Sequence, residues 1–144
     1  DVQDLAQDVF IKVFKNLPKF KAESKLSTWI GQIAYRESVN YLRKRNRYND
    51  YPIDEFTENQ LKESSQNPEE RSIANDTKMM VRTAVAKLPE RYRQVVVLYH
   101  LEEFSYQEIS EITEMPEGTV KSYIFRGRKL LKEYLSTVLK NEQL

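Results

Sequence analysis

The stretch from Ser105 to Leu135, SYQEISEITEMPEGTVKSYIFRGRKLLKEYL, constrains the fold of this chain more than any other. Ser105 followed by Glu108 matches a capping box, the reciprocal pair of side chains that closes the first turn of a helix. A short helix is therefore predicted, and its apolar side holds Tyr106, Ile109 and Ile112. Thr113–Met115 is predicted as a turn. Pro116 suits the first turn of a second helix, where its missing N–H costs nothing.

The second helix has two chemically opposite faces when its residues are placed at ~100° per position. The apolar arc holds Val120, Tyr123, Ile124, Gly127, Leu130, Leu131, Tyr134 and Leu135. The opposite arc holds Lys121, Ser122, Phe125, Arg126, Arg128, Lys129 and Lys132. Five of these seven residues are cationic and none is acidic, whereas a face that only needed water would more often mix charge signs. The pattern favours a helix-turn-helix whose second helix enters the DNA major groove. A solvated basic face on an ordinary helical hairpin is the plainer alternative.

The composition favours an all-α protein of the reducing cytoplasm. Only 3 Gly and 5 Pro occur in 144 residues, and no alternating β pattern stands out. The chain has no cysteine, so it can form neither a disulfide nor a thiolate zinc site. No apolar run is long enough for membrane insertion. We also expect no cofactor and no metal. His100 is the single histidine and has no catalytic pattern around it, so a packing role is expected.

Charge is distributed unevenly and predicts two domains. Residues 1–45 carry 9 Lys+Arg and 5 Asp+Glu, residues 46–76 carry 3 and 8, and residues 77–144 carry 11 and 9. Two basic blocks therefore flank an acidic middle, which is typical of two domains joined by a linker. The predicted division is a domain at 1–47, an acidic flexible linker at 48–66 and a four-helix domain at 67–144 that ends in the helix-turn-helix. The polar stretch that suggests the linker begins at Asn46.

Residues 1–17 are predicted to form an amphipathic helix. Its expected buried stripe is Val2, Leu5, Val9, Phe10, Val13 and Leu17. Acidic residues crowd the start of this helix, as the helix dipole favours. They could do no more than stabilise it, or the outward ridge Asp4, Gln7, Asp8 and Ile11 could dock on a basic partner. A lone amphipathic helix needs a partner to pack against, so further helices are expected upstream of Asp1.

A loop at Pro18–Lys25 is expected to lead into a long helix that starts at Ser27 or Thr28. Its expected inner side is Leu26, Ile30, Ile33, Ala34 and Tyr41, and its end is a basic cluster at residues 43–47. A separate polar stripe holds Lys25, Gln32, Arg36, Asn40 and Arg43. Trp29 lies beside that stripe, either as a core residue or as a platform for a nucleobase. Loop lysines, an aromatic ring and a basic stripe together suit single-stranded nucleic acid.

Two further helices are predicted before Ser105. Asn67, Pro68 and Glu70 form a start signal for the first of them. Its expected stripe is Ile73, Met80, Val81, Ala84, Val85 and Leu88. Pro89 ends that helix and opens the next, whose expected inner side is Tyr92, Val95, Val96 and Tyr99.

Two segments of the chain resemble one known family. DVQDLAQDVFIKVFKNLPKF…LSTWIGQIAYRESVNYLRKR resembles region 2 of the extracytoplasmic-function (ECF) sigma factors of bacterial RNA polymerase. LPERYRQVVVLYHLEEFSYQEISEITEMPEGTVKSYIFRGRKLLKEYL is similar to their region 4. GTVKSYI alone also looks like the helix-turn-helix of two-component response regulators, but the two segments together are specific. In this family, region 2 also includes helices before the position that corresponds to Asp1.

The resemblance implies a role for each candidate residue. Reading of the −35 element in the major groove falls to Lys121, Ser122, Phe125 and Arg126, and phosphate contact to Thr119, Tyr123, Arg128 and Lys129. Capture of a base flipped from the −10 single strand falls to Phe20, Lys21, Ser24, Lys25, Trp29, Gln32, Arg36 and Asn40. Docking on core polymerase falls to Asp4, Gln7, Asp8 and Ile11. The acidic linker resembles the segment that runs through the polymerase cleft toward the RNA exit path.

The same resemblance implies partners and leaves two alternatives to exclude. The partners are promoter DNA, core RNA polymerase (its β′ clamp coiled coil and β flap) and an anti-sigma factor. One alternative is a helix-turn-helix regulator that binds a palindromic duplex without joining the polymerase. The other is an enzyme that acts on nucleic acid, for which the sequence holds no metal-ligand cluster and no acid–base pair.

Overall fold

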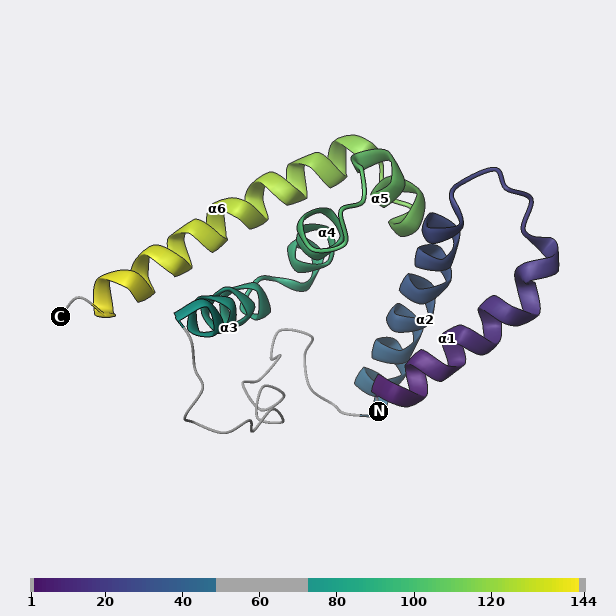
Figure 1. Cartoon of the computed structure of the whole chain (residues 1–144), viewed down its shortest axis with the longest axis horizontal. Coiled ribbons are helices and arrows are strands. Elements are labelled where there is room, and N and C mark those ends of the chain that lie inside the picture. The colour runs from purple at the N-terminus through teal and green to yellow at the C-terminus, as the bar shows by residue number, and fades with distance from the viewer. Residues whose placement is uncertain (1, 49–72, 143–144) are drawn as a thin grey trace. The chain divides into compact units, whose positions relative to one another are not determined.

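The structure is a computed structural model that describes residues 2–48 and 73–142, and every regular element in these ranges is helical (Figure 1). The elements are α1 (Val2–Asn16), a 3₁₀ helix η1 (Leu17–Lys19), α2 (Leu26–Tyr48), α3 (Ile73–Ala86), α4 (Glu90–His100), α5 (Tyr106–Thr113) and α6 (Glu117–Glu142). The predicted all-α class is confirmed. No helix in these ranges is both long enough and apolar enough to cross a membrane.

By its packing, the chain divides into two compact units. The first contains α1, η1, α2, α5 and the first turn of α6, and the second contains α3, α4 and the rest of α6. The division therefore joins α5 to the two N-terminal helices. The capping signal predicted at Asn67–Glu70 lies outside the described residues.

In the first unit, α1 and α2 form an antiparallel hairpin (Figure 1). Lys12 on α1 and Glu37 on α2 are joined by an ion pair of 2.6 Å. No residue of α1 is fully buried, and the predicted buried stripe is wrong at Val2, Phe10 and Leu17, which are exposed. Leu5, Val9 and Val13 are half-buried. The helical periodicity of the sequence identified the apolar face of α1. In the structure, α2 packs against only part of that face.

The long helix α2 begins earlier and ends later than predicted. It starts at Leu26, which is exposed and not on the inner side as expected. Ile30, Ile33, Ala34 and Tyr41 are half-buried, as the pattern indicated. The helix runs to Tyr48, so the first three residues of the polar stretch that begins at Asn46 are helical.

The second unit has its core between α3, α4 and α6. Its buried apolar residues are Ala84, Leu88, Val95, Val96 and Ile124. Gly127 of α6 lies directly against α4, because a Cβ at this position would lie 2.7 Å from Cγ2 of Val96. Tyr92 and Tyr123 make an edge-to-face contact, with ring centroids 5.3 Å apart. The predicted inner side of α4 is confirmed, whereas Val81 on α3 is more exposed than its place in the stripe suggested.

Candidate nucleic-acid interface

The predicted capping box at the start of α5 is present. The Glu108 N–H donates to Ser105 Oγ at 3.1 Å, and the Ser105 N–H donates to Glu108 Oε2 at 2.8 Å. Ile109 and Ile112 are buried, as the periodicity predicted. The short helix therefore has a fixed start and an anchored inner face.

The turn after α5 is Glu114–Pro116 and begins one residue later than predicted, because Thr113 still belongs to the helix. Glu114 ends α5 in the left-handed conformation with φ of 61°, which is how many helices terminate. The Ser110 hydroxyl donates to the Met115 carbonyl at 2.6 Å and so closes the turn. Pro116 immediately precedes α6, and its carbonyl accepts the Val120 N–H at 3.1 Å.

The two faces of α6 are separated as predicted. Val120, Ile124 and Gly127 are buried, and the other residues of the apolar arc are half-buried. The opposite face exposes Lys121, Phe125, Arg126, Arg128, Lys129 and Lys132. Phe125 is 71% exposed, although phenylalanine is among the residue types that are most often buried. An accessible aromatic ring can contact a thymine methyl group, and the cations around it can contact phosphates.

Three other candidate residues for DNA contact are less accessible. Ser122 and Thr119 are half-buried near the start of α6. Tyr123 is half-buried as well, and its ring packs on Tyr92. Only the hydroxyl end of Tyr123 could therefore serve as a phosphate contact.

Two aromatic residues assigned to the −10 strand lie together, one in the segment before α2 and one in α2 itself. The rings of Phe20 and Trp29 lie 5.2 Å apart and are tilted by 44°. Ala22 in this loop has φ of 55°, a conformation that residues with a Cβ rarely adopt. Trp29 is half-buried, so it is partly a packing residue and partly available to a ligand. Lys21 and Asn40 are exposed and Ser24 is half-buried.

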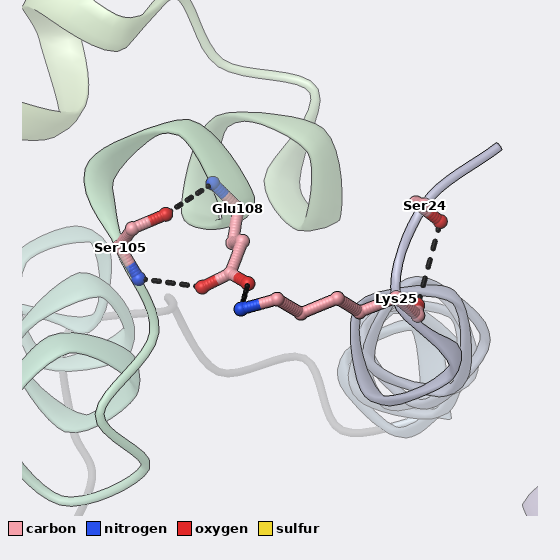
Figure 2. A network of polar contacts seen from close by, with 4 residues as sticks. All are labelled: Ser24, Lys25, Ser105 and Glu108. Atoms are coloured by element: carbon pink, nitrogen blue, oxygen red, sulfur yellow. Dashed lines mark hydrogen bonds and ion pairs between the residues drawn. The ribbon is translucent and has the colours of Figure 1, made fainter.

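Three predicted residues of the α2 stripe contact α5. Nζ of Lys25 lies 3.1 Å from Oε1 of Glu108, and Figure 2 shows this pair together with the capping box and Ser24. Nε2 of Gln32 donates to the Glu111 carbonyl at 3.1 Å. The Arg36 guanidinium forms an ion pair with the Glu114 carboxylate. These pairs join residues about 80 positions apart, and the sequence held no signal for them.

The capping box and the lysine act on the same carboxylate. The Ser105 N–H, followed in size of effect by the Lys25 ammonium, lowers the pKa of Glu108 below the usual range of a glutamate. Both groups favour the ionised carboxylate, because one donates a hydrogen bond and the other carries positive charge. Glu108 therefore helps to start α5 and to hold it on α2.

The four residues predicted to dock on polymerase, Asp4, Gln7, Asp8 and Ile11, are all exposed on one side of α1. His100 is exposed at the end of α4, where its ring packs edge-on against Tyr99. Partial burial and then Arg128 lower the pKa of His100. Within residues 2–48 and 73–142, no three His, Asp or Glu side chains gather in a way that could hold a metal ion.

Two family models match the chain and together cover most of it. Residues 1–48 match Sigma-70 region 2, and residues 78–131 match Sigma-70, region 4. The first match contains α1 and α2, and the second contains α4, α5 and the exposed basic face of α6 except Lys132. A helix-turn-helix regulator that acts apart from the polymerase would not need the first of them.

Curated relatives match over nearly the whole chain. The chain is 34% identical over 143 residues to the ECF RNA polymerase sigma factor SigW of Bacillus subtilis, covering 94% of this chain and 75% of the relative. It is 30% identical over 146 residues to the ECF RNA polymerase sigma-E factor of Escherichia coli K12, covering 97% and 76%.

A solved structure agrees with these matches. The sigma factor RpoE of Bartonella quintana, in complex with the anti-sigma factor NepR, matches with a TM-score of 0.73 and 25% identity, covering 93% of this chain and 80% of that one. With both sigma regions in order and relatives at 30% identity or more, the chain belongs to the ECF RNA polymerase sigma factors, the proteins that direct RNA polymerase to promoters.

Proposed function

We propose that α6 reads the −35 promoter element in the major groove through Lys121, Ser122, Phe125 and Arg126. The observation that carries this proposal is the exposed basic face of α6, opposite the buried Val120, Ile124 and Gly127. Arg126 is exposed on that face, and a bidentate pair of its guanidinium with guanine would discriminate between bases by about 1–3 kcal/mol. Arg128 and Lys129, helped by Thr119 and the hydroxyl of Tyr123, contact phosphates and set the register.

The loop Phe20–Lys25 and the polar stripe of α2 capture a base of the −10 element from the non-template strand. The Phe20–Trp29 pair supports this assignment, because it places two aromatic rings beside the stripe and leaves both partly accessible. Flipping a base costs a few kcal/mol, which stacking and hydrogen bonds from Lys25, Gln32 and Arg36 offset.

Partners follow from the same assignment. The ridge Asp4, Gln7, Asp8 and Ile11 docks on the β′ clamp coiled coil, and residues 67–144 act at the β flap with the acidic segment 48–66 as linker. The chain works in the cytoplasm, where the polymerase is. An anti-sigma factor controls it, a proposal supported by the similar RpoE, whose structure is a complex with the anti-sigma factor NepR.

The test is run-off transcription by core RNA polymerase over a library of randomised −35 and −10 elements, with and without this chain. Arg126→Ala is compared with Lys140→Ala, which removes an exposed cation near the far end of the same helix. We expect transcripts that depend on the chain, and a change of preferred −35 base for Arg126→Ala only. If both variants keep the same preferred −35 base, the assignment of α6 is wrong.

A further inference from the structure

The contacts between α5 and α2 lie on the stripe that the proposed function assigns to the −10 strand. Lys25, Gln32 and Arg36 recur on one side of α2, and all three are engaged by α5. A nucleic acid that approached this side would compete with α5, because α5 already engages the Gln32 amide and the charges of Lys25 and Arg36.

The surface that α5 presents has the charge of a nucleic acid. Residues 101–120 contain six glutamates and no lysine or arginine. Two of them, Glu108 and Glu114, supply carboxylates to Lys25 and Arg36. Between these pairs, the Glu111 carbonyl accepts from Gln32; it belongs to the last turn of α5, whose carbonyls have no partner within the helix. Three of the five residues of the stripe, Lys25, Gln32 and Arg36, are thus engaged by oxygen acceptors.

Apolar packing supports the polar contacts. A Cβ at Gly31 would lie 3.0 Å from Cδ1 of Ile112 and 3.9 Å from Cζ of Phe104, so α2 and the segment around α5 approach closely there. Ile112 is 1% exposed. Both partners of the Arg36–Glu114 pair are exposed, and in the Lys25–Glu108 pair the lysine is exposed. Exposed pairs contribute only about 0–1 kcal/mol each. An attachment of this kind is specific in position and weak enough to be reversed.

We propose that α5 is an internal inhibitor of −10 recognition: its acidic side occupies the α2 stripe as a substitute for DNA, and it must leave before the single strand can bind. This proposal rests on the proposed function of α2. It assigns to α5 a second role, besides its place in the helix-turn-helix, and makes −10 binding conditional on a change within the chain.

A reversible covalent lock tests the proposal. The chain has no cysteine, so the pair Gly31→Cys and Ile112→Cys would be the only thiols. Cγ1 of Ile112 lies 3.2 Å from the Cβ position at Gly31. Adding one C–C bond puts the two Cβ atoms at most about 4.7 Å apart, close to the range of a disulfide. Neither residue belongs to the set assigned to DNA.

The readout is binding of a fluorescent −10 non-template oligonucleotide by core polymerase carrying the oxidised or the reduced pair. We expect the oxidised form to bind at least about 10-fold more weakly, since the open state is removed, and reduction to restore binding. The oxidised form should still bind a −35 duplex as the reduced form does. Equal −10 binding by the two forms would overturn the proposal.

A second variant weakens the contact between α5 and α2 instead of locking it, and it changes no core residue. Glu108→Gln with Glu114→Gln removes both ion pairs, and −10 affinity should rise by about 2-fold to 10-fold. Asp76→Asn with Glu133→Gln is the matched control, because it removes the same charge from exposed sites in the second unit. An equal rise in both would mean that only net charge matters, and the inhibitor role would be wrong.

Failure of the proposed function is distinguishable from failure of this inference. If wild-type holoenzyme does not bind the −10 strand, the assignment of α2 is at fault. The rate of disulfide formation in the cysteine pair then decides about α5. A rate that falls when core polymerase and promoter are added supports the release of α5, and an unchanged rate excludes it.

Discussion

The Glu108 carboxylate lies between two donors that belong to different helices: Oε2 accepts the Ser105 N–H at 2.8 Å, and Oε1 lies 3.1 Å from Nζ of Lys25 (Figure 2). One side chain therefore links the start of α5 to the surface of α2. A change at Glu108 affects local helix formation and long-range packing together.

Acid should weaken this link. The pKa of Glu108 is lowered in the folded chain, so its stabilising effect is present above the ordinary glutamate pKa of about 4.3 and is lost as the pH falls through the lowered value. Glu108→Gln should be less stable than wild type at neutral pH, and the difference should shrink in this acid range. Thermal unfolding of both proteins at a series of pH values measures it. A difference that is constant down to the lowest pH would contradict the ionic role of Glu108.

Ser105→Ala should remove the cap of α5. The Ser105 side chain accepts the Glu108 N–H, and loss of such a cap costs about 0.5–2 kcal/mol of unfolding free energy. Urea unfolding followed by circular dichroism measures the loss. Ser136→Ala is the control, because Ser136 is exposed within α6, where alanine is the better helix former. A loss of equal size in both variants would refute the cap.

Gly127→Ala and Gly118→Ala should have opposite effects, although both lie in α6. A Cβ at Gly127 would meet Val96 Cγ2 at 2.7 Å and Tyr92 Cβ at 3.3 Å, so overpacking should cost about 1–3 kcal/mol, partly offset by the higher helix propensity of alanine. Nothing lies within 4 Å of a Cβ at Gly118, so that variant should gain up to about 1 kcal/mol. Chemical unfolding of the two variants checks the contrast, and a stabilised Gly127→Ala would mean that α4 and α6 are less closely packed than described.

The salt dependence of −35 duplex binding should separate phosphate contacts from base contacts. Removing one phosphate contact lowers the slope of log affinity against log salt concentration by about 1, and Arg128→Ala should show this change. Lys140→Ala should leave the slope as it is. Fluorescence anisotropy at several salt concentrations gives the slopes. Equal slopes for wild type and Arg128→Ala would exclude a phosphate contact by Arg128.

The features that could be predicted from sequence depend on neighbours along the chain. The capping box joins residues three positions apart, and the two faces of α6 follow from a repeat that a single helix imposes. Both features could therefore be predicted from a few residues. The ends of α2 were predicted less accurately, because helix termini depend on weak local preferences.

Packing between distant segments could not be read in the same way. Phe10 was expected to be buried because it is apolar and lies on the predicted apolar stripe of α1, yet it is 72% exposed. The periodicity of a helix does not say how much of its apolar face another helix covers. Likewise, nothing at Gln32 indicates that its amide will meet the Glu111 carbonyl 79 positions later. The contacts of α5 with α2 are therefore a result of the structure alone.

The middle contact between α2 and α5 has a consequence for how such a chain can change over generations. Gln32 donates to a main-chain oxygen, so any residue at position 111 that keeps the helix also keeps this acceptor. Glu108 and Glu114, in contrast, contribute through their side chains, and either can be replaced separately. Drift at these two positions would adjust the strength of the attachment in small steps while its place on α2 stays the same.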